Sequence, residues 1–162
     1  KSTKNSFDKW GTPIALQLAI IKQESSFTQF AKPERKRIFG IIPGSRSSTA
    51  FGFAQATNPT WDWYKTKTGN KNASRANFAN VTDFIGWYVT QSEEIVGISK
   101  KDFYNQYLAY HEGQGGWKKG THQNKKWLID VAKNVERNAN MYNNQLKDCE
   151  NKLNKKGLFG IF

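Results

Sequence analysis

Apolar residues are densest between positions 14 and 21, and this stretch predicts a buried helix. It is apolar around almost the whole helical circumference, which is typical of a helix at the centre of a fold. Thr12 and Pro13 supply a start signal, because a hydroxyl side chain caps a helix and proline suits its first position. The helix is expected to run into the polar segment 22–27.

The same periodicity predicts four later helices. Asn58 and Pro59 begin the first of them, and Ser99 together with Asp102 as a capping box is the predicted N-terminal cap of the third. An apolar stripe that starts at Trp127 marks the last and longest helix. The expected helices cover residues 58–68, 82–96, 103–112 and about 125–154.

The remaining segments define the fold class and the domain organisation. No internal repeat and no alternating strand pattern is present, so the chain is predicted to be all-α or nearly so, as one domain over residues 1–154. Residues 31–50 contain prolines, glycines and basic residues and are predicted to form a long basic loop. Residues 38–42 place four apolar residues in that loop, either as a short buried turn or as an exposed contact. The C-terminal tail, residues 155–162, is expected to be flexible.

Composition narrows the classes of protein. The chain has 162 residues, of which 37% are hydrophobic and 14% aromatic, which suits one folded domain and excludes extensive disorder. Cys149 is the one cysteine, so no internal disulfide and no cysteine-based zinc site is expected. The two histidines are too few for a histidine-rich metal site, so neither metal nor cofactor is expected. No apolar run approaches the roughly 20 residues that span a bilayer.

The net charge of +12 indicates an anionic partner. Nucleic acid, an anionic membrane surface and an acidic cell-wall polymer all fit such a charge. Because the 20 lysines far outnumber the 5 arginines, the charge favours general attraction over the bidentate recognition of bases. No nucleic-acid-binding motif accompanies it, so no specific nucleic-acid partner is expected.

Glu24 is the carboxylate whose position has chemical consequences. It lies at the C-terminal end of the apolar helix, where the helix dipole disfavours a negative charge. Apolar surroundings disfavour the ionised form further. Both effects raise the pKa of Glu24, as a general acid that works near neutral pH requires. The alternative is an exposed glutamate at a frayed helix end.

Three motifs in order resemble the soluble lytic transglycosylase (SLT domain) family of the lysozyme-like superfamily. The run from Trp10 to Phe27, with its Glu24-Ser25 pair, is similar to the family's opening segment, whose Glu-Ser pair contains the catalytic acid. Residues 50–55 resemble the family's Gly-Leu-Met-Gln element, and residues 108–113 resemble its Ala-Tyr-Asn-Ala-Gly element. The resemblance covers about residues 7–146, and it implies a lysozyme-like α-helical domain.

The resemblance also implies a reaction. Members of the family cleave the β-1,4 bond between N-acetylmuramic acid and N-acetylglucosamine in peptidoglycan and leave a 1,6-anhydro-N-acetylmuramic acid end. One carboxyl group first protonates the leaving oxygen and then withdraws the proton of the C6 hydroxyl. The sugar's own acetamido group stabilises the intermediate, so a second carboxylate is not required.

Roles are carried over to the positions that match. The resemblance implies that Glu24 is the catalytic acid and base and that the Tyr110 hydroxyl orients it. It implies that Gln55 lines the sugar cleft and that Ser25 is the partner of Glu24. At Gly52, it implies a backbone that passes close to the sugar.

The chain departs from the family pattern at two places that are also expected to bind substrate. Phe53 and Ala54 replace Leu-Met, which adds a ring to the cleft wall. His111 and Glu112 replace Asn-Ala and form either a solvated rim, a second proton-handling pair or altered sugar contacts. The 31–50 loop makes the stretch of chain between the first and second motifs longer than expected for the family. We expect the loop to extend a binding subsite or to dock a partner.

No other carboxylate suits the role of a nucleophile. Glu34 is in the loop, Asp62 follows the second motif, and Glu93 and Glu94 are expected to face solvent. Glu112 alone lies beside a matched motif. This favours a lytic transglycosylase over a hydrolytic muramidase on the same fold, with an inactive peptidoglycan-binding or scaffold module as the third interpretation.

The substrate implies the location. Peptidoglycan lies outside the bacterial cytoplasmic membrane, so we expect the cell envelope or periplasm. No export signal is visible at Lys1–Asn5, which is typical of a mature or trimmed terminus. Besides glycan strands, the expected partner is an envelope or secretion-machine protein that contacts the 31–50 loop or the tail. We expect a monomer, with Cys149 as a surface thiol or an intermolecular link.

Overall fold

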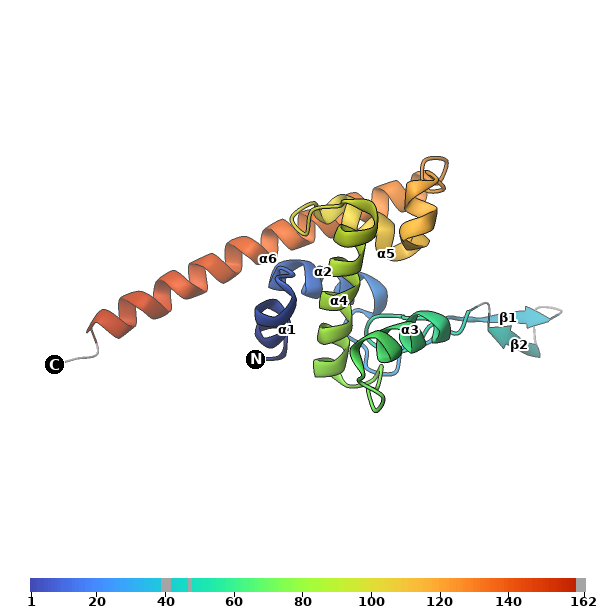
Figure 1. Cartoon of the computed structure of the whole chain (residues 1–162), viewed down its shortest axis with the longest axis horizontal. Coiled ribbons are helices and arrows are strands. Elements are labelled where there is room, and N and C mark those ends of the chain that lie inside the picture. The colour runs from blue at the N-terminus through green and yellow to red at the C-terminus, as the bar shows by residue number, and fades with distance from the viewer. Residues whose placement is uncertain (39–41, 47, 160–162) are drawn as a thin grey trace.

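The computed structural model describes the backbone of residues 1–38, 42–46 and 48–159 and the side chains of residues 1–34 and 48–149. Within these residues the chain forms six helices and one two-stranded sheet (Figure 1). The elements are α1 (Ser2–Trp10), α2 (Ile14–Ser25), β1 (Arg35–Ile38), β2 (Ile42–Arg46), α3 (Asn58–Thr68), α4 (Phe78–Val96), α5 (Phe103–Lys118) and α6 (Lys126–Phe159). Of the described helices, none is both long and apolar enough to cross a membrane.

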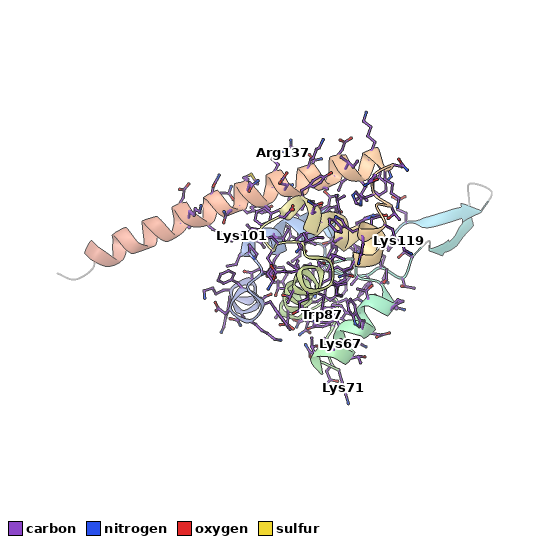
Figure 2. All side chains as sticks on the ribbon, turned by 45° about the horizontal axis from the view of Figure 1, so that its top comes forward. Lys67, Lys71, Trp87, Lys101, Lys119 and Arg137 are labelled. Carbon is purple, nitrogen blue, oxygen red and sulfur yellow. The ribbon has the colours of Figure 1, made fainter. Side chains whose placement is uncertain are left out.

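Helix α2 lies in the core, as its all-round apolar sequence predicts. Leu16 and Ile20 are fully buried, and the helix packs against α6, α1 and α4. Helix α4 adds an aromatic cluster around Phe84 and Trp87. Figure 2 shows Trp87 among densely packed side chains, whereas the labelled lysines lie around the outside of the body. The predicted all-α class is confirmed apart from one hairpin.

Three helix starts differ from the prediction. Pro13, not Thr12, is the cap residue of α2, because the Thr12 hydroxyl is buried and donates to the carbonyl of Gly86 at 3.0 Å. Helix α4 begins at Phe78, four residues earlier than predicted, since the Asn77 side chain accepts from two amide groups of its first turn. Helix α1 was not predicted. Of the predicted Ser99–Asp102 cap of α5, Asp102 is itself the cap residue, and its side chain accepts from the Asn105 amide.

The segment predicted to be a basic loop contains an antiparallel hairpin. Arg35 pairs with Arg46, and Ile38 pairs with Ile42. The hairpin projects from the helical body (Figure 1), and such a ribbon needs no alternating apolar face to pair its backbone. The prediction that no strand is present is therefore wrong at this segment. Phe39 and Ile41 of the predicted apolar cluster lie outside the described residues.

The last two helices also differ from the prediction. Helix α5 continues past Gly113 to Lys118 after a kink, because Gly113 adopts φ 75° and ψ 156° and lets the chain resume a helix. Helix α6 continues to Phe159, past the predicted end at Asn154, so only residues 160–162 of the predicted tail lie outside the described residues. Its C-terminal half extends beyond the body (Figure 1). Trp127, the first residue of the predicted apolar stripe of this helix, is 57% exposed.

Asp83 joins three helices. Its carboxylate accepts from Lys9 Nζ at 2.9 Å, Trp10 Nε1 at 2.8 Å and the Tyr64 hydroxyl at 2.7 Å. Burial opposes ionisation, but these hydrogen bonds outweigh it and lower the pKa of Asp83. The ionised carboxylate thereby fixes α1 and α3 to α4.

Candidate active site

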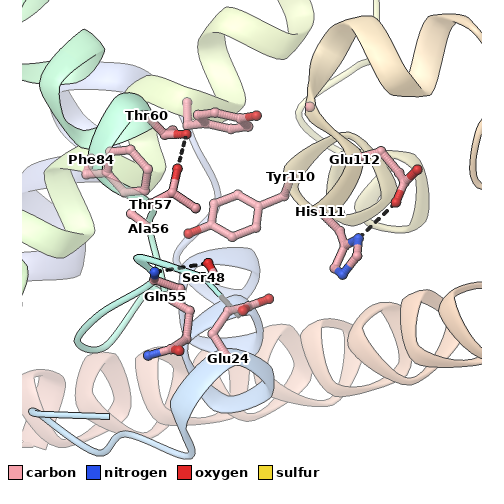
Figure 3. A pocket seen from close by; sticks show the side chains of 13 residues that line it. Glu24, Ser48, Gln55, Ala56, Thr57, Thr60, Phe84, Tyr110, His111 and Glu112 are labelled. Carbon is pink, nitrogen blue, oxygen red and sulfur yellow. Dashed lines mark hydrogen bonds and ion pairs between the residues drawn. The ribbon is translucent and has the colours of Figure 1, made fainter. Parts of the chain in front are cut away.

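Glu24 lies in the last turn of α2, where the helix emerges from the core into a cavity. It is partly buried, and its side chain rises into the cavity beside the Tyr110 ring (Figure 3). Burial raises the pKa of Glu24 to about 7, against the lowering effect of a hydrogen bond from Tyr107. The raised pKa of Glu24 that its position at the helix end and its apolar surroundings predicted is confirmed. A large share of this carboxyl is therefore protonated at neutral pH.

The tyrosine that holds Glu24 is Tyr107, not Tyr110. The Tyr107 hydroxyl donates to Glu24 Oε1 at 3.0 Å, whereas the Tyr110 hydroxyl donates to the backbone carbonyl of Ala54 at 2.7 Å. The two residues are three positions apart and share one face of α5, with their rings stacked at 6.5 Å. The role predicted for the Tyr110 hydroxyl is corrected in this respect. The three-residue spacing indicated that Tyr107 and Tyr110 lie on the same helix face, but it did not indicate which of the two hydroxyls reaches Glu24.

Replacing Tyr107 by Phe tests this assignment. Because its hydrogen bond stabilises the carboxylate, Tyr107→Phe is expected to raise the pKa of Glu24 above about 7. The matched control is Tyr110→Phe, which removes a hydroxyl from the same helix face without removing a bond to Glu24. Titration of the Glu24 carboxyl carbon by NMR measures both variants. A larger shift with Tyr110→Phe would contradict the assignment.

The cavity has a volume of about 540 Å³ and combines polar and aromatic walls. Of the predicted site residues, it is lined by Glu24, Gln55, Tyr110, His111 and Glu112 (Figure 3). Ser25, Gly52, Phe53 and Ala54 are not among its lining residues. The lining residues that the sequence did not single out are Ser48, Ala50, Ala56, Thr57, Thr60, Phe84, Tyr88 and Gly113. Because these residues are either close to a motif or apolar residues of a helix, the sequence did not distinguish a role in the cavity from a role in packing.

Three residues of the second motif, Gly52, Phe53 and Ala54, support the cavity wall without lining the cavity. Gly52 has φ +77°, and a Cβ there would lie 2.1 Å from the carbonyl oxygen of Arg75. The close backbone neighbour of this glycine is therefore Arg75. Phe53 packs against Phe78 with ring centroids 5.4 Å apart, and Ala54 is buried. These three residues support the wall, which corrects the expected contact of Phe53 and Ala54 with the cleft.

Gln55 and Ser25 fix the backbone at the cavity. Gln55 donates from Nε2 to the carbonyls of Ala31 and Gly52, at 3.0 and 2.8 Å. The Ser25 hydroxyl donates to the carbonyl of Ile21 at 3.2 Å. Ser25 thus closes the last turn of α2, and Gln55 holds the motif loop against the chain that leaves α2.

His111 and Glu112 form a fixed charge cluster at one side of the cavity. The Glu112 side chain is 6% exposed, and Lys125 Nζ lies 2.8 Å from both of its oxygens. Thr121 and His111 also bind it. Burial opposes its ionisation, but these partners lower the pKa of Glu112 to about 2. Glu112 is therefore an ionised anchor, and Glu24 is the carboxyl that exchanges a proton near neutral pH.

The other carboxylates lie elsewhere. Glu93 and Glu94 are exposed on α4, as predicted, and Glu34 and Asp62 are exposed as well. In the described part of the chain, no three His, Cys, Asp or Glu side chains come together as a metal site. The arrangement can donate a proton from Glu24 to a bound group and take one back, with Tyr107 stabilising the carboxylate between the two steps.

Comparison with known proteins gives one match, to a protein family. A family model described as "Transglycosylase SLT domain" matches residues 1–149. This range contains Glu24, the cavity and helices α1 to α5. The comparisons with curated proteins and with solved structures gave no match.

Proposed function

The chain belongs to the transglycosylase SLT domain family, and on this basis we propose that it cleaves the glycan strand of peptidoglycan as a lytic transglycosylase. The family supports a transglycosylase-type enzyme with a lysozyme-like fold. The proposal for this chain depends on one observation, the partly buried Glu24 with a pKa of about 7 in the cavity. The bond cleaved is the β-1,4 bond between N-acetylmuramic acid and N-acetylglucosamine.

The first step uses the protonated form of Glu24. Its carboxyl donates a proton to the glycosidic oxygen as the bond to the anomeric carbon of N-acetylmuramic acid breaks. The N-acetylglucosamine side leaves as an alcohol. The acetamido group of the muramyl residue supplies the electrons that stabilise the anomeric carbon.

In the second step Glu24, now a carboxylate, takes the proton of the C6 hydroxyl. As the C6 oxygen bonds to the anomeric carbon, the acetamido oxygen releases that carbon, and a 1,6-anhydro ring closes. The C6 proton stays on Glu24 and replaces the one given to the leaving oxygen, so no water is consumed and the carboxyl is regenerated. The hydrogen bond from Tyr107 supports this step because it stabilises the carboxylate after the first transfer.

The hydrolytic alternative needs a second free carboxylate or a positioned water. Among the described residues that line the cavity, Glu24 and Glu112 are the only carboxylates. Glu112 is bound to Lys125, Thr121 and His111, which reduces its nucleophilicity. This favours the transglycosylase over the muramidase.

Since the substrate is peptidoglycan, we also propose that the protein acts in the bacterial cell envelope.

Product chemistry distinguishes the two reactions. We expect digestion of purified peptidoglycan to release muropeptides with 1,6-anhydro-N-acetylmuramic acid ends, about 18 mass units lighter than the hydrolytic products because no water is added. Mass spectrometry before and after borohydride reduction measures this, since anhydro ends are not reduced. Reducible ends throughout the digest would identify a muramidase and contradict the proposal.

A further inference from the structure

Trp127 places a large exposed ring next to the cavity. It lies in the first turn of α6 and is 57% exposed. The ring contacts His111, with centroids 5.3 Å apart and an interplanar angle of 78°. His111 lines the cavity that contains Glu24. Trp127 and the cavity are therefore joined through one histidine ring.

The His111 ring is held in one orientation. Its Nδ1 lies 3.0 Å from Glu112 Oε1, and since an ionised carboxylate only accepts hydrogen bonds, Nδ1 carries the hydrogen. Glu112 is itself fixed by Lys125 at 2.8 Å. The other ring nitrogen, Nε2, points away from Glu112 (Figure 3). It remains available to bind a hydroxyl or amide group of a ligand.

The size of the cavity requires contacts beyond it. A volume of about 540 Å³ is in the range of a site for one small molecule. A polymeric substrate must therefore continue past the rim on at least one side. His111, Glu112 and Gly113 line one part of the cavity, and Trp127, which is not among the lining residues, contacts His111.

We propose that Trp127 and His111 form an outer subsite for one N-acetylhexosamine residue of the glycan strand. The exposed indole stacks on the apolar face of the sugar ring, and His111 Nε2 hydrogen-bonds to a hydroxyl or acetamido group. Glu112 and Lys125 act as positioning residues for the histidine. The subsite rests on the proposed function, because it assumes that the strand enters the Glu24 cavity.

Binding is tested in the inactive Glu24→Gln background, so that the ligand survives. The probes are the dimer and the hexamer of β-1,4-linked N-acetylglucosamine, measured by calorimetry. We expect Trp127→Ala to weaken hexamer binding about tenfold and dimer binding less than about threefold, and Trp127→Phe to retain hexamer binding within about threefold. The matched control is Met141→Ala, which truncates a residue of the same helix that is 40% exposed and lies about four turns further along.

NMR supplies a second readout that does not depend on affinity. The indole N–H signal of Trp127, assigned by its loss in Trp127→Phe, is expected to shift on addition of the hexamer. An unshifted signal at saturation, equal hexamer affinities with and without Trp127, or no hexamer binding at all would overturn the subsite. The proposed function fails separately, if the wild-type protein binds the hexamer at Trp127 but releases no anhydro ends from peptidoglycan.

Discussion

Replacing Glu24 by Gln is expected to reduce the release of anhydro-muropeptides by at least about 10³-fold, because the amide can neither donate nor take back the proton. The measurement is the rate of product release from purified peptidoglycan. Glu112→Gln is the matched comparison, since Glu112 lines the same cavity. We expect a loss of about tenfold or less for it, because it anchors His111 and transfers no proton. Equal losses in the two variants would contradict the assignment of Glu24 as the single acid and base.

The same variant tests the pKa of Glu24 through stability. Because the folded protein holds this proton up to a pKa of about 7, against 4.5 in the unfolded chain, the free energy of unfolding falls as the pH rises from 4.5 to 7. The total fall is at most about 3 kcal/mol. Glu24→Gln removes it, so the variant is expected to melt several degrees above the wild type at pH 8 and close to it at pH 4.5. A difference that does not change with pH would contradict the raised pKa.

Gly52→Ala is expected to lower the free energy of unfolding by about 2–5 kcal/mol. Two costs add at this position: a φ of +77°, and a Cβ 2.1 Å from the backbone oxygen of Arg75. Gly69→Ala is the control, because Gly69 has a φ of +72° and nothing lies within 4 Å of an added Cβ. It should lose only the conformational part, about 1 kcal/mol. Urea denaturation of both variants gives the difference.

The outcome at Gly52 distinguishes two reasons for the glycine. If the residue serves mainly the contact with Arg75, the variant loses stability more than Gly69→Ala does. If it serves mainly the approach of a sugar, Gly52→Ala and Gly69→Ala lose equal stability, and Gly52→Ala alone loses substrate affinity. The structure supports the first reason, since Gly52 is not among the residues that line the cavity.

The sequence predicted an element correctly where the pattern that specifies it lies in residues close together along the chain. The all-round apolar run 14–21 predicted the buried helix α2, and Ser99 with Asp102 predicted the cap of α5. The hairpin at Arg35–Arg46 was missed because its residues show no apolar alternation, and helix α1 because its sequence is mostly polar. The hairpin is held by backbone pairing, which leaves no pattern in its side chains, and α1 depends on docking against the distant helix α4.

The sequence by itself determined the helical class, the family motifs and the position of Glu24 at the end of an apolar helix. Each of these features depends on residues that are close together along the chain. Only the tertiary structure decided that Tyr107 rather than Tyr110 binds Glu24, that Gly52 faces Arg75, and that Trp127 is exposed beside His111. Helical periodicity gives the face on which a side chain lies, but not the neighbour that the face meets. Glu24 and Tyr107 are 83 residues apart, and the packing of both α2 and α5 against α6 sets the geometry of the pair.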